Sequence, residues 1–440
     1  MRSLHALLIT LAAALCGGDA LAEQRFPPPD FSPGYSMPVT EAQGAPARDD
    51  ARGYIDAAAL AAALALASYL ALGRRSRRGL VVLGIASLAY FGFYRHGCIC
   101  PIGAIQNVVL AIADSGYALP LTAAIFFALP LLFTLFFGRA FCAAVCPLGA
   151  IQDIVLVSPV AVPGWLARAL GLVPFVYLGA AVLLVAMGST FLICRYDPFV
   201  GFFRLSAGLD LTIFGASLLV IGVFVGRPYC RFLCPYGALL GLVSRLSWRR
   251  VRITPAECIQ CRLCEDSCPF GAITTPSPET PPARRAGKTA LALTLLALPV
   301  VIGLGALAGR ALSPAFAHTH ATIRLAERVW LEDAGRVDGT TDQSDAFRAT
   351  GLSTDDLYLA AGAVRAGFDT GTTLLGAFVG LVIGATLLRI SLRRKRTEYE
   401  ADPALCVACG RCYRYCPVEI DRRKKLEQAE GRAEQDDGSA

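Results

Sequence analysis

The stretch CIQCRLCEDSCP at residues 258–269 and its counterpart CVACGRCYRYCP at residues 406–417 decide the fold. Each has four cysteines in the spacing C-x2-C-x2-C-x3-C, followed at once by proline. This spacing is typical of chains that bind [4Fe–4S] clusters through cysteine thiolates. Zinc is the alternative, but zinc sites more often pair two C-x2-C units across a longer insert.

The two runs also predict how ligands are shared. In ferredoxins with two clusters, the fourth cysteine of each run binds the cluster of the other run. If the two halves did not meet, each run would have to hold a cluster of its own. The predicted crossed sets are Cys258, Cys261, Cys264 with Cys416, and Cys406, Cys409, Cys412 with Cys268.

Apolar blocks occupy much of the remaining chain. Of its 440 residues 55% are hydrophobic and only 17% are charged, which indicates a membrane protein. The net charge of +7 collects beside the apolar blocks, so membrane topology explains it better than nucleic acid does. Seven segments are candidate spans, at roughly residues 57–73, 79–93, 119–138, 170–193, 211–226, 290–308 and 371–388.

The N-terminus indicates export. Arg2, an apolar stretch and the A-x-A site at residues 20–22 predict a signal peptide, with an uncleaved anchor as the alternative. Arginines then follow alternate spans, at residues 74–78, 139, 245–252 and 389–396, and predict that these ends face the cytoplasm. We therefore expect a multi-pass protein of the bacterial inner membrane with both cysteine runs in the cytoplasm.

A second pattern recurs after four successive apolar segments. CPIGAIQ (100–106), CPLGAIQ (146–152) and CPYGALL (234–240) match one another, and DPFVGFF (197–203) is a degraded copy. Proline beside the cysteine ends one helix or starts the next, and the amides at that helix start favour a thiolate. Because successive copies alternate sides, we expect a core like an inverted repeat.

The cysteines of this repeat predict two further metal sites. Four thiolates on the cytoplasmic side suffice for an iron–sulfur cluster or a zinc ion. For the periplasmic set, a disulfide that involves Cys194 is the main alternative, and packing of small buried cysteines is an alternative for both. The cytoplasmic set is Cys142, Cys146, Cys230 and Cys234, and the periplasmic set is Cys98, Cys100 and Cys194, with His96 and Asp197 beside it.

Two weaker patterns lie near the last spans. His318 and His320 form an H-x-H pair that could bind copper or zinc, although solvated histidines are the simpler interpretation. The stretch TGTT at residues 370–373 faintly resembles a flavin-attachment sequence, but it lacks the alanine and the usual upstream aspartate. We expect it to cap the last span, and we expect no flavin.

The predicted fold is an all-α polytopic membrane protein of about six to seven spans, with a ferredoxin-like 2[4Fe–4S] domain built from two separated segments. The halves can meet only if the last span returns beside span five or six. The predicted parts are a signal peptide (1–22), a disordered periplasmic segment (23–54), a five-span core with the repeats (55–250), the first ferredoxin half (251–280), span six, a periplasmic helical cap and span seven (286–391), and the second ferredoxin half with a tail (392–440).

With its C-x3-C-P pairs at 142–147 and 230–235 and its two ferredoxin runs, the chain resembles the membrane polyferredoxins of the NosR/NirI and NapH type over roughly residues 74–417. The resemblance implies electron transfer between the quinol pool and a periplasmic partner of nitrogen-oxide respiration, such as nitrous-oxide or nitrate reductase. The chain departs from the NosR pattern, because it lacks a large N-terminal flavin-binding domain and splits its ferredoxin runs around two spans.

We therefore expect an electron-transfer component rather than a stand-alone enzyme, with one or two iron–sulfur centres in the membrane core besides the two [4Fe–4S] clusters. The hydrocarbon layer is about 30 Å thick, so a periplasmic centre would have to relay electrons across it. The alternatives are a redox-sensing regulatory or metalloenzyme-maturation protein that is not a conduit, and a zinc-stabilised scaffold.

Overall fold

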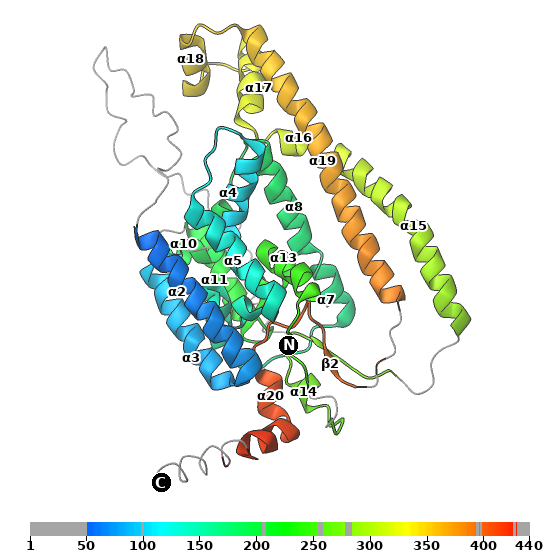
Figure 1. Cartoon of the computed structure of the whole chain (residues 1–440). Helices are drawn as coiled ribbons and strands as arrows, with labels where there is room; N and C mark the ends of the chain where they lie inside the picture. Colours follow the sequence, from blue (N-terminus) through cyan, green and yellow to red (C-terminus); the bar gives the residue numbers. More distant parts are fainter. Residues whose placement is uncertain are drawn as a thin grey trace, which may run out of the picture. The chain divides into compact units, whose positions relative to one another are not determined.

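The computed structural model describes residues 51–97, 101–204, 208–253, 258–277, 284–392, 396, 398–425 and 428. Within these ranges helices dominate, and two short strands complete the fold (Figure 1). The predicted signal peptide, Cys98 and Cys100 lie outside the described residues. The described residues belong to the structural unit Ala47–Ala440.

The membrane core is built from helices whose apolar faces meet. On α2 (Ala51–Ser68), Leu60, Leu64 and Ala67 recur at helical spacing and are at most 1% exposed, so this face packs inward. The core elements that follow are η1 (Tyr69–Gly73), α3 (Arg77–Ser87), η2 (Leu88–Tyr94), α4 (Pro101–Ala113), α5 (Leu121–Phe137), η3 (Phe141–Val145), α6 (Pro147–Val155), α7 (Gly164–Leu170), α8 (Val173–Ala186), α9 (Leu192–Tyr196), α10 (Pro198–Arg204), α11 (Leu209–Gly222), α12 (Pro228–Phe232), α13 (Pro235–Val243) and η4 (Ser244–Leu246).

Fewer helices are long enough to span than the seven that the sequence predicts. Four helical stretches of the described chain are long and apolar enough, and a fifth counts if the bent pair α10 and α11 is one span. The predicted spans at 79–93 and 119–138 do form helices. However, α3 begins with arginines, and α5 has only 17 residues. The four stretches are Arg52–Gly73, Gly164–Ala186, Thr289–Ala311 and Thr354–Ser391.

The helices α15 (Arg284–Ala311) and α19 (Thr354–Ser391) pack along each other through glycines. A Cβ atom on Gly376 would collide with the carbonyl oxygen of Gly305, so a larger residue cannot take this place. The predicted return of the last span beside span six is confirmed.

Three short helices join α15 to α19, where the sequence predicts a helical cap. They are α16 (Ser313–Ala317), α17 (Ala321–Asp333) and α18 (Asp342–Ala349). The prediction that residues 370–373 cap the last span is wrong, because they lie in the middle of α19. That helix begins earlier, where the Ser353 hydroxyl accepts the Asp356 amide at 3.1 Å.

The two ferredoxin halves meet in space. The strand β1 (Ile273–Thr274) of the first half pairs antiparallel with β2 (Glu400–Ala401) of the second. The helix α14 (Leu263–Asp266) packs against α20 (Arg411–Tyr415). Two segments separated by two spans therefore form one small domain.

Candidate iron–sulfur sites

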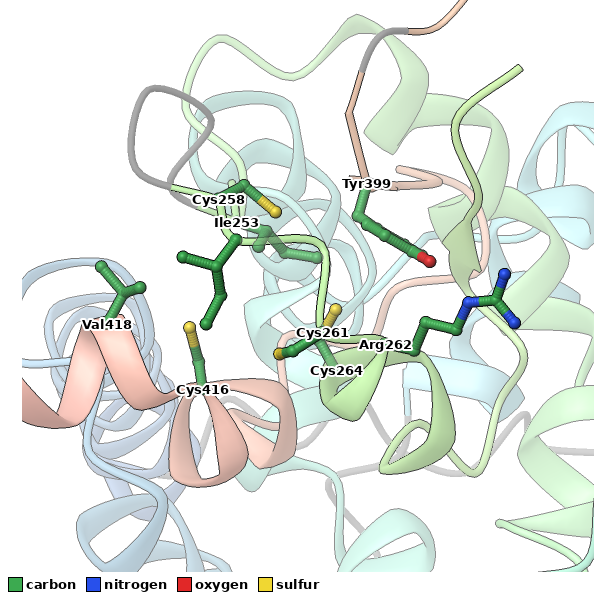
Figure 2. A pocket seen from close by; sticks show the side chains of 9 residues that line it. Ile253, Cys258, Cys261, Arg262, Cys264, Tyr399, Cys416 and Val418 are labelled. Carbon is green, nitrogen blue, oxygen red and sulfur yellow. The ribbon is translucent and has the colours of Figure 1, made fainter. Parts of the chain in front are cut away.

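The first predicted ligand set lines a single pocket between the halves. Cys258, Cys261 and Cys264 come from the first half, and Cys416 follows α20 in the second (Figure 2). Mostly apolar side chains form the rest of the lining, which includes Ile253, Ile259, Arg262, Tyr399 and Val418. The pocket therefore brings together the four thiols that crossed ligation requires.

The second predicted set lies deeper, against the membrane core. Burial raises the pKa of Cys412, and the neighbouring thiols of Cys406, Cys409 and Cys268 raise it further. Burial also raises the pKa of Cys406 to about 12. These four thiols are thus close enough to interact. They are partly buried, and as thiolates they need the positive charge that a metal centre supplies.

Both cysteine runs have the same local backbone. The residues just before and just after the second cysteine of each run have positive φ angles, at 54° and 65° for Gln260 and Arg262 and at 53° and 72° for Ala408 and Gly410. Left-handed residues among ordinary ones turn successive amides toward one side and make a concave site for an anion. Three of the four positions are not glycine, so the runs hold a conformation that usually occurs at functional sites.

The residues present fit a [4Fe–4S] cluster in each set. Four cysteines are the usual ligands of such a cluster, although four thiolates also suit zinc. The crossed arrangement favours iron, because it places three ligands on one run and the fourth on the other. Among the described residues, no three His, Cys, Asp or Glu side chains are grouped as ligands of a single metal ion.

In the membrane core, Cys146 and Cys234 occupy equivalent places. Each precedes a helix that begins with proline, at Pro147 of α6 and Pro235 of α13, as the repeat predicts. The Sγ atom of Cys234 accepts the Gly237 amide at 3.3 Å. The amides at the helix start are therefore placed to favour a thiolate.

The repeat cysteines that the sequence predicts on the cytoplasmic side also converge. Burial raises the pKa of Cys234, and the thiols of Cys230, Cys146 and Cys142 add to this shift. Gln152 links the two copies, because its Oε1 accepts the Tyr229 amide at 3.0 Å and its Nε2 lies 3.3 Å from Cys230 Sγ. The second and fourth repeat copies therefore face each other.

Arg139 connects this set to the second ferredoxin set. Its Nη1 donates to the carbonyl oxygen of Ala404 at 2.8 Å, two residues before Cys406, and its Nη2 lies 3.7 Å from Cys142 Sγ. The side chain is buried, with 7% of the residue exposed. The guanidinium also counteracts the rise in the pKa of Cys406, so it lies near thiols of both sets.

Arg227 lies in the same region and is 2% exposed. It donates to the carbonyl oxygen of Cys142. Burial alone would lower its pKa, but Asp153 and the thiols of Cys230 and Cys409 raise it. The guanidinium therefore stays charged beside thiols of both sets.

Asp153 on α6 joins three arginines from different parts of the chain. It pairs with Arg77 of α3, with Arg227 at 3.5 Å and with Arg411 of α20 at 3.4 Å. Burial raises the pKa of this carboxyl, but the three guanidinium groups outweigh it and lower the pKa to about 2. Asp153 therefore links the membrane core to the second ferredoxin half, a role that the sequence did not predict.

Arginines that the sequence assigned to topology also bind the second ferredoxin half. Arg75 pairs with the buried Glu419 at 2.8 Å and lies 5.0 Å from the ring centroid of Tyr413. Arg77 donates to the carbonyl oxygen of Cys409 at 3.1 Å. The arginines after the first span therefore act as a platform for this half.

The first and third repeat copies are also linked through a glutamine, as the second and fourth are. The Oε1 of Gln106 accepts the Cys194 amide at 3.1 Å, as Gln152 accepts that of Tyr229. In place of a cysteine, Asp197 caps α10 through the Phe199 amide at 2.9 Å. The glutamine shared by two copies was a sequence signal for this pairing. Cys194 is described, but its predicted partners Cys98 and Cys100 are not.

The two cap histidines have separate partners. His318 Nε2 lies 2.9 Å from Glu327 Oε2, whereas His320 caps α17 by accepting the Thr322 amide at 3.2 Å. The H-x-H pair thus serves two different contacts in this structure.

Two family models match the chain, and both are described as 4Fe–4S binding domains. One covers residues 119–172 and 208–254, and the other covers residues 251–274 and 399–420. The fold and the sites define a membrane protein with 4Fe–4S binding domains. No solved structure matches the chain.

Parts of the chain are similar to parts of several curated proteins. The chain is 43% identical over 68 residues to "Putative electron transport protein YccM" of Escherichia coli, a match of 16% of this chain and 19% of that protein. It is 34% identical over 124 residues to NirI of Paracoccus denitrificans, a match of 27% and 18%. It is 38% identical over 64 residues to "Regulatory protein NosR" of Pseudomonas aeruginosa, a match of 14% and 8%.

The resemblance to NosR and NirI is confirmed: parts of the chain are similar in sequence to these proteins and match models of 4Fe–4S binding domains. It spans less than a fifth of the length of YccM and of NirI.

Proposed function

We propose that the chain passes electrons between the membrane quinol pool and a periplasmic redox protein or metalloenzyme of nitrogen-oxide respiration. When bound, an iron–sulfur cluster supplies one-electron transfer. The observation that carries the proposal is the position of Arg139 and Arg227. Both lie between the second ferredoxin set and the set in the membrane core, and neither is more than 7% exposed. Their hydrogen bonds to the carbonyl oxygens of Ala404 and Cys142 tie the two cysteine sets to each other.

The proposed orientation places the ferredoxin domain in the cytoplasm and the helical cap in the periplasm of an inner membrane. Its support is the arginine platform after the first span, since arginine collects on the cytoplasmic side. The length of α19 agrees: 38 residues at about 1.5 Å each extend beyond a hydrocarbon layer of about 30 Å. The cap precedes one end of this helix and β2 follows the other.

Under this proposal the core holds further centres. Cys142, Cys146, Cys230 and Cys234 are the proposed ligands of a cytoplasmic one. Cys194, with Cys98 and Cys100, belongs to a proposed periplasmic one, supported by the matching roles of Gln106 and Gln152.

The test is reduction of the purified full chain by a short-chain ubiquinol or menaquinol under anaerobic conditions, followed by visible absorbance. The expected result is partial bleaching by quinol and full bleaching by dithionite. Cys234→Ala is expected to slow reduction by quinol, whereas Ser217→Ala, at an exposed position on α11, leaves it unchanged.

Bleaching by dithionite but by no quinol would contradict a conduit. It would favour the second candidate, a redox-sensing regulatory or maturation protein, in line with the description of one relative as "Regulatory protein NosR".

A further inference from the structure

The helical cap contains a cavity that the electron-transfer sites do not use. Its volume is about 760 Å³, and α16, α17 and the first half of α19 line it. Cavities of roughly 300–1,000 Å³ are the usual size for small-molecule sites. The cavity is thus large enough for an organic ligand with a ring.

The floor of the cavity is apolar and buried. Ala317, Ile323, Ala326 and Ala361 line it, and each is at most 4% exposed. Small side chains at three of these four positions leave the space open. A flat hydrophobic group bound here would displace water from the apolar floor, which lowers the free energy.

The rim of the cavity carries polar and aromatic groups. His318 and Glu327 form a pair at 2.9 Å, and Trp330, Arg365 and Asp369 lie along the same cavity. The His–Glu pair can donate or accept one hydrogen bond at the edge of a ring. With two carboxylates and one arginine, the rim does not favour an anion such as a phosphate head group.

The cavity lies next to the ends of two apolar segments of the chain. Ser313 follows the candidate span Thr289–Ala311 by two residues, and Asp369 precedes the apolar segment 371–388. Under the proposed topology the cavity lies at the membrane surface, within reach of a molecule dissolved in the bilayer.

We infer that this cavity binds the head group of a quinone or quinol, with its ring on the alanine floor and a ring oxygen at the His318–Glu327 pair. The choice of ligand rests on the proposed function, because only that function requires a quinone. The size of the cavity, its apolar floor, a rim that does not favour anions and the proposed position beside the bilayer together favour this ligand over a phospholipid head group or a soluble anion.

Binding can be measured through Trp330, which lines the cavity. Replacing the exposed Trp165 and Trp248 by Phe leaves it as the one tryptophan of the full chain, which has three. Ubiquinone-1 is then titrated into this protein in detergent, and saturable quenching of fluorescence is expected. Ala361→Phe fills the floor and is expected to weaken binding at least about tenfold, whereas Leu359→Phe, 73% exposed and outside the lining, does not.

His318→Ala gives a second variant that keeps the fold intact, because its side chain is 62% exposed. It is expected to weaken binding about fivefold through the loss of one hydrogen bond. Quenching that does not saturate would overturn the inference. Affinities of the Ala361→Phe and His318→Ala variants equal to that of the unsubstituted protein would also overturn it, as would displacement of the ligand by phosphatidylglycerol micelles alone. If quinol reduces the clusters of the Ala361→Phe and His318→Ala variants as it reduces those of the unsubstituted protein, the quinone site is ruled out but the proposed function stands. Saturable binding in the cavity without reduction of the clusters would support the site and contradict the proposed function.

Discussion

Asp153→Asn is expected to loosen the attachment of the second ferredoxin half to the membrane core. The carboxylate is 10% exposed and pairs with Arg77, Arg227 and Arg411. Burial raises its pKa, but these arginines bring it down from 3.8 to about 2. A shift of that size corresponds to about 2 kcal/mol between the charged and the neutral carboxyl. Because the folded-state pKa is the lower one, this stabilisation is fully present at pH 7 and is lost only as the pH falls from about 4 toward 2.

The assay is urea unfolding of the protein in detergent, followed by the visible absorbance of its clusters. Asp153→Asn is expected to lower the free energy of unfolding by about 2 kcal/mol, with the slope unchanged. Asp338→Asn is the matched control, since it is exposed and has no ion pair within the described residues. A double-mutant cycle with Arg411→Gln isolates the link between the two parts. Equal stability of the Asp153 and Asp338 variants, or a coupling near zero, would refute the reasoning.

Three further outcomes follow from the structure. Gly376→Ile is expected to push α19 away from α15, whereas Gly303→Ile, whose Cβ meets nothing within 4 Å, is not; cross-linking between cysteines placed on the two helices measures this, and equal yields would contradict it. Cys416→Ser is expected to abolish the same low-temperature EPR signal as Cys261→Ser, because both line one pocket; loss of different signals would mean that each run holds its own cluster. Arg139→Gln is expected to lower the reduction potential of the adjacent centres by removing a positive charge, and an unchanged redox titration would speak against that role.

Much of the candidate site could be predicted because cysteine spacing is local and specific. The runs at 258–269 and 406–417 predict a shared domain, and the structure pairs β1 with β2 between them. The repeat predicts proline at the start of α6 and α13, where it is found. These predictions succeed because ligand geometry and proline stereochemistry depend on few residues.

The docking contacts could not be predicted, because they join residues far apart in sequence. Asp153 resembles any other charged residue near a helix end until Arg77 and Arg411 are brought beside it. The prediction that residues 370–373 begin the last span was wrong for a different reason. Apolar length sets where a span begins in the bilayer, but Ser353 caps a helix that continues beyond it.

The central claim is that thiols from two distant segments hold iron at one end of a membrane bundle. Counting iron and acid-labile sulfide in anaerobically purified full chain tests it most directly. Two [4Fe–4S] clusters predict about eight of each per chain, and more if the core centres are filled. Protein that contains zinc but neither iron nor sulfide would contradict the account.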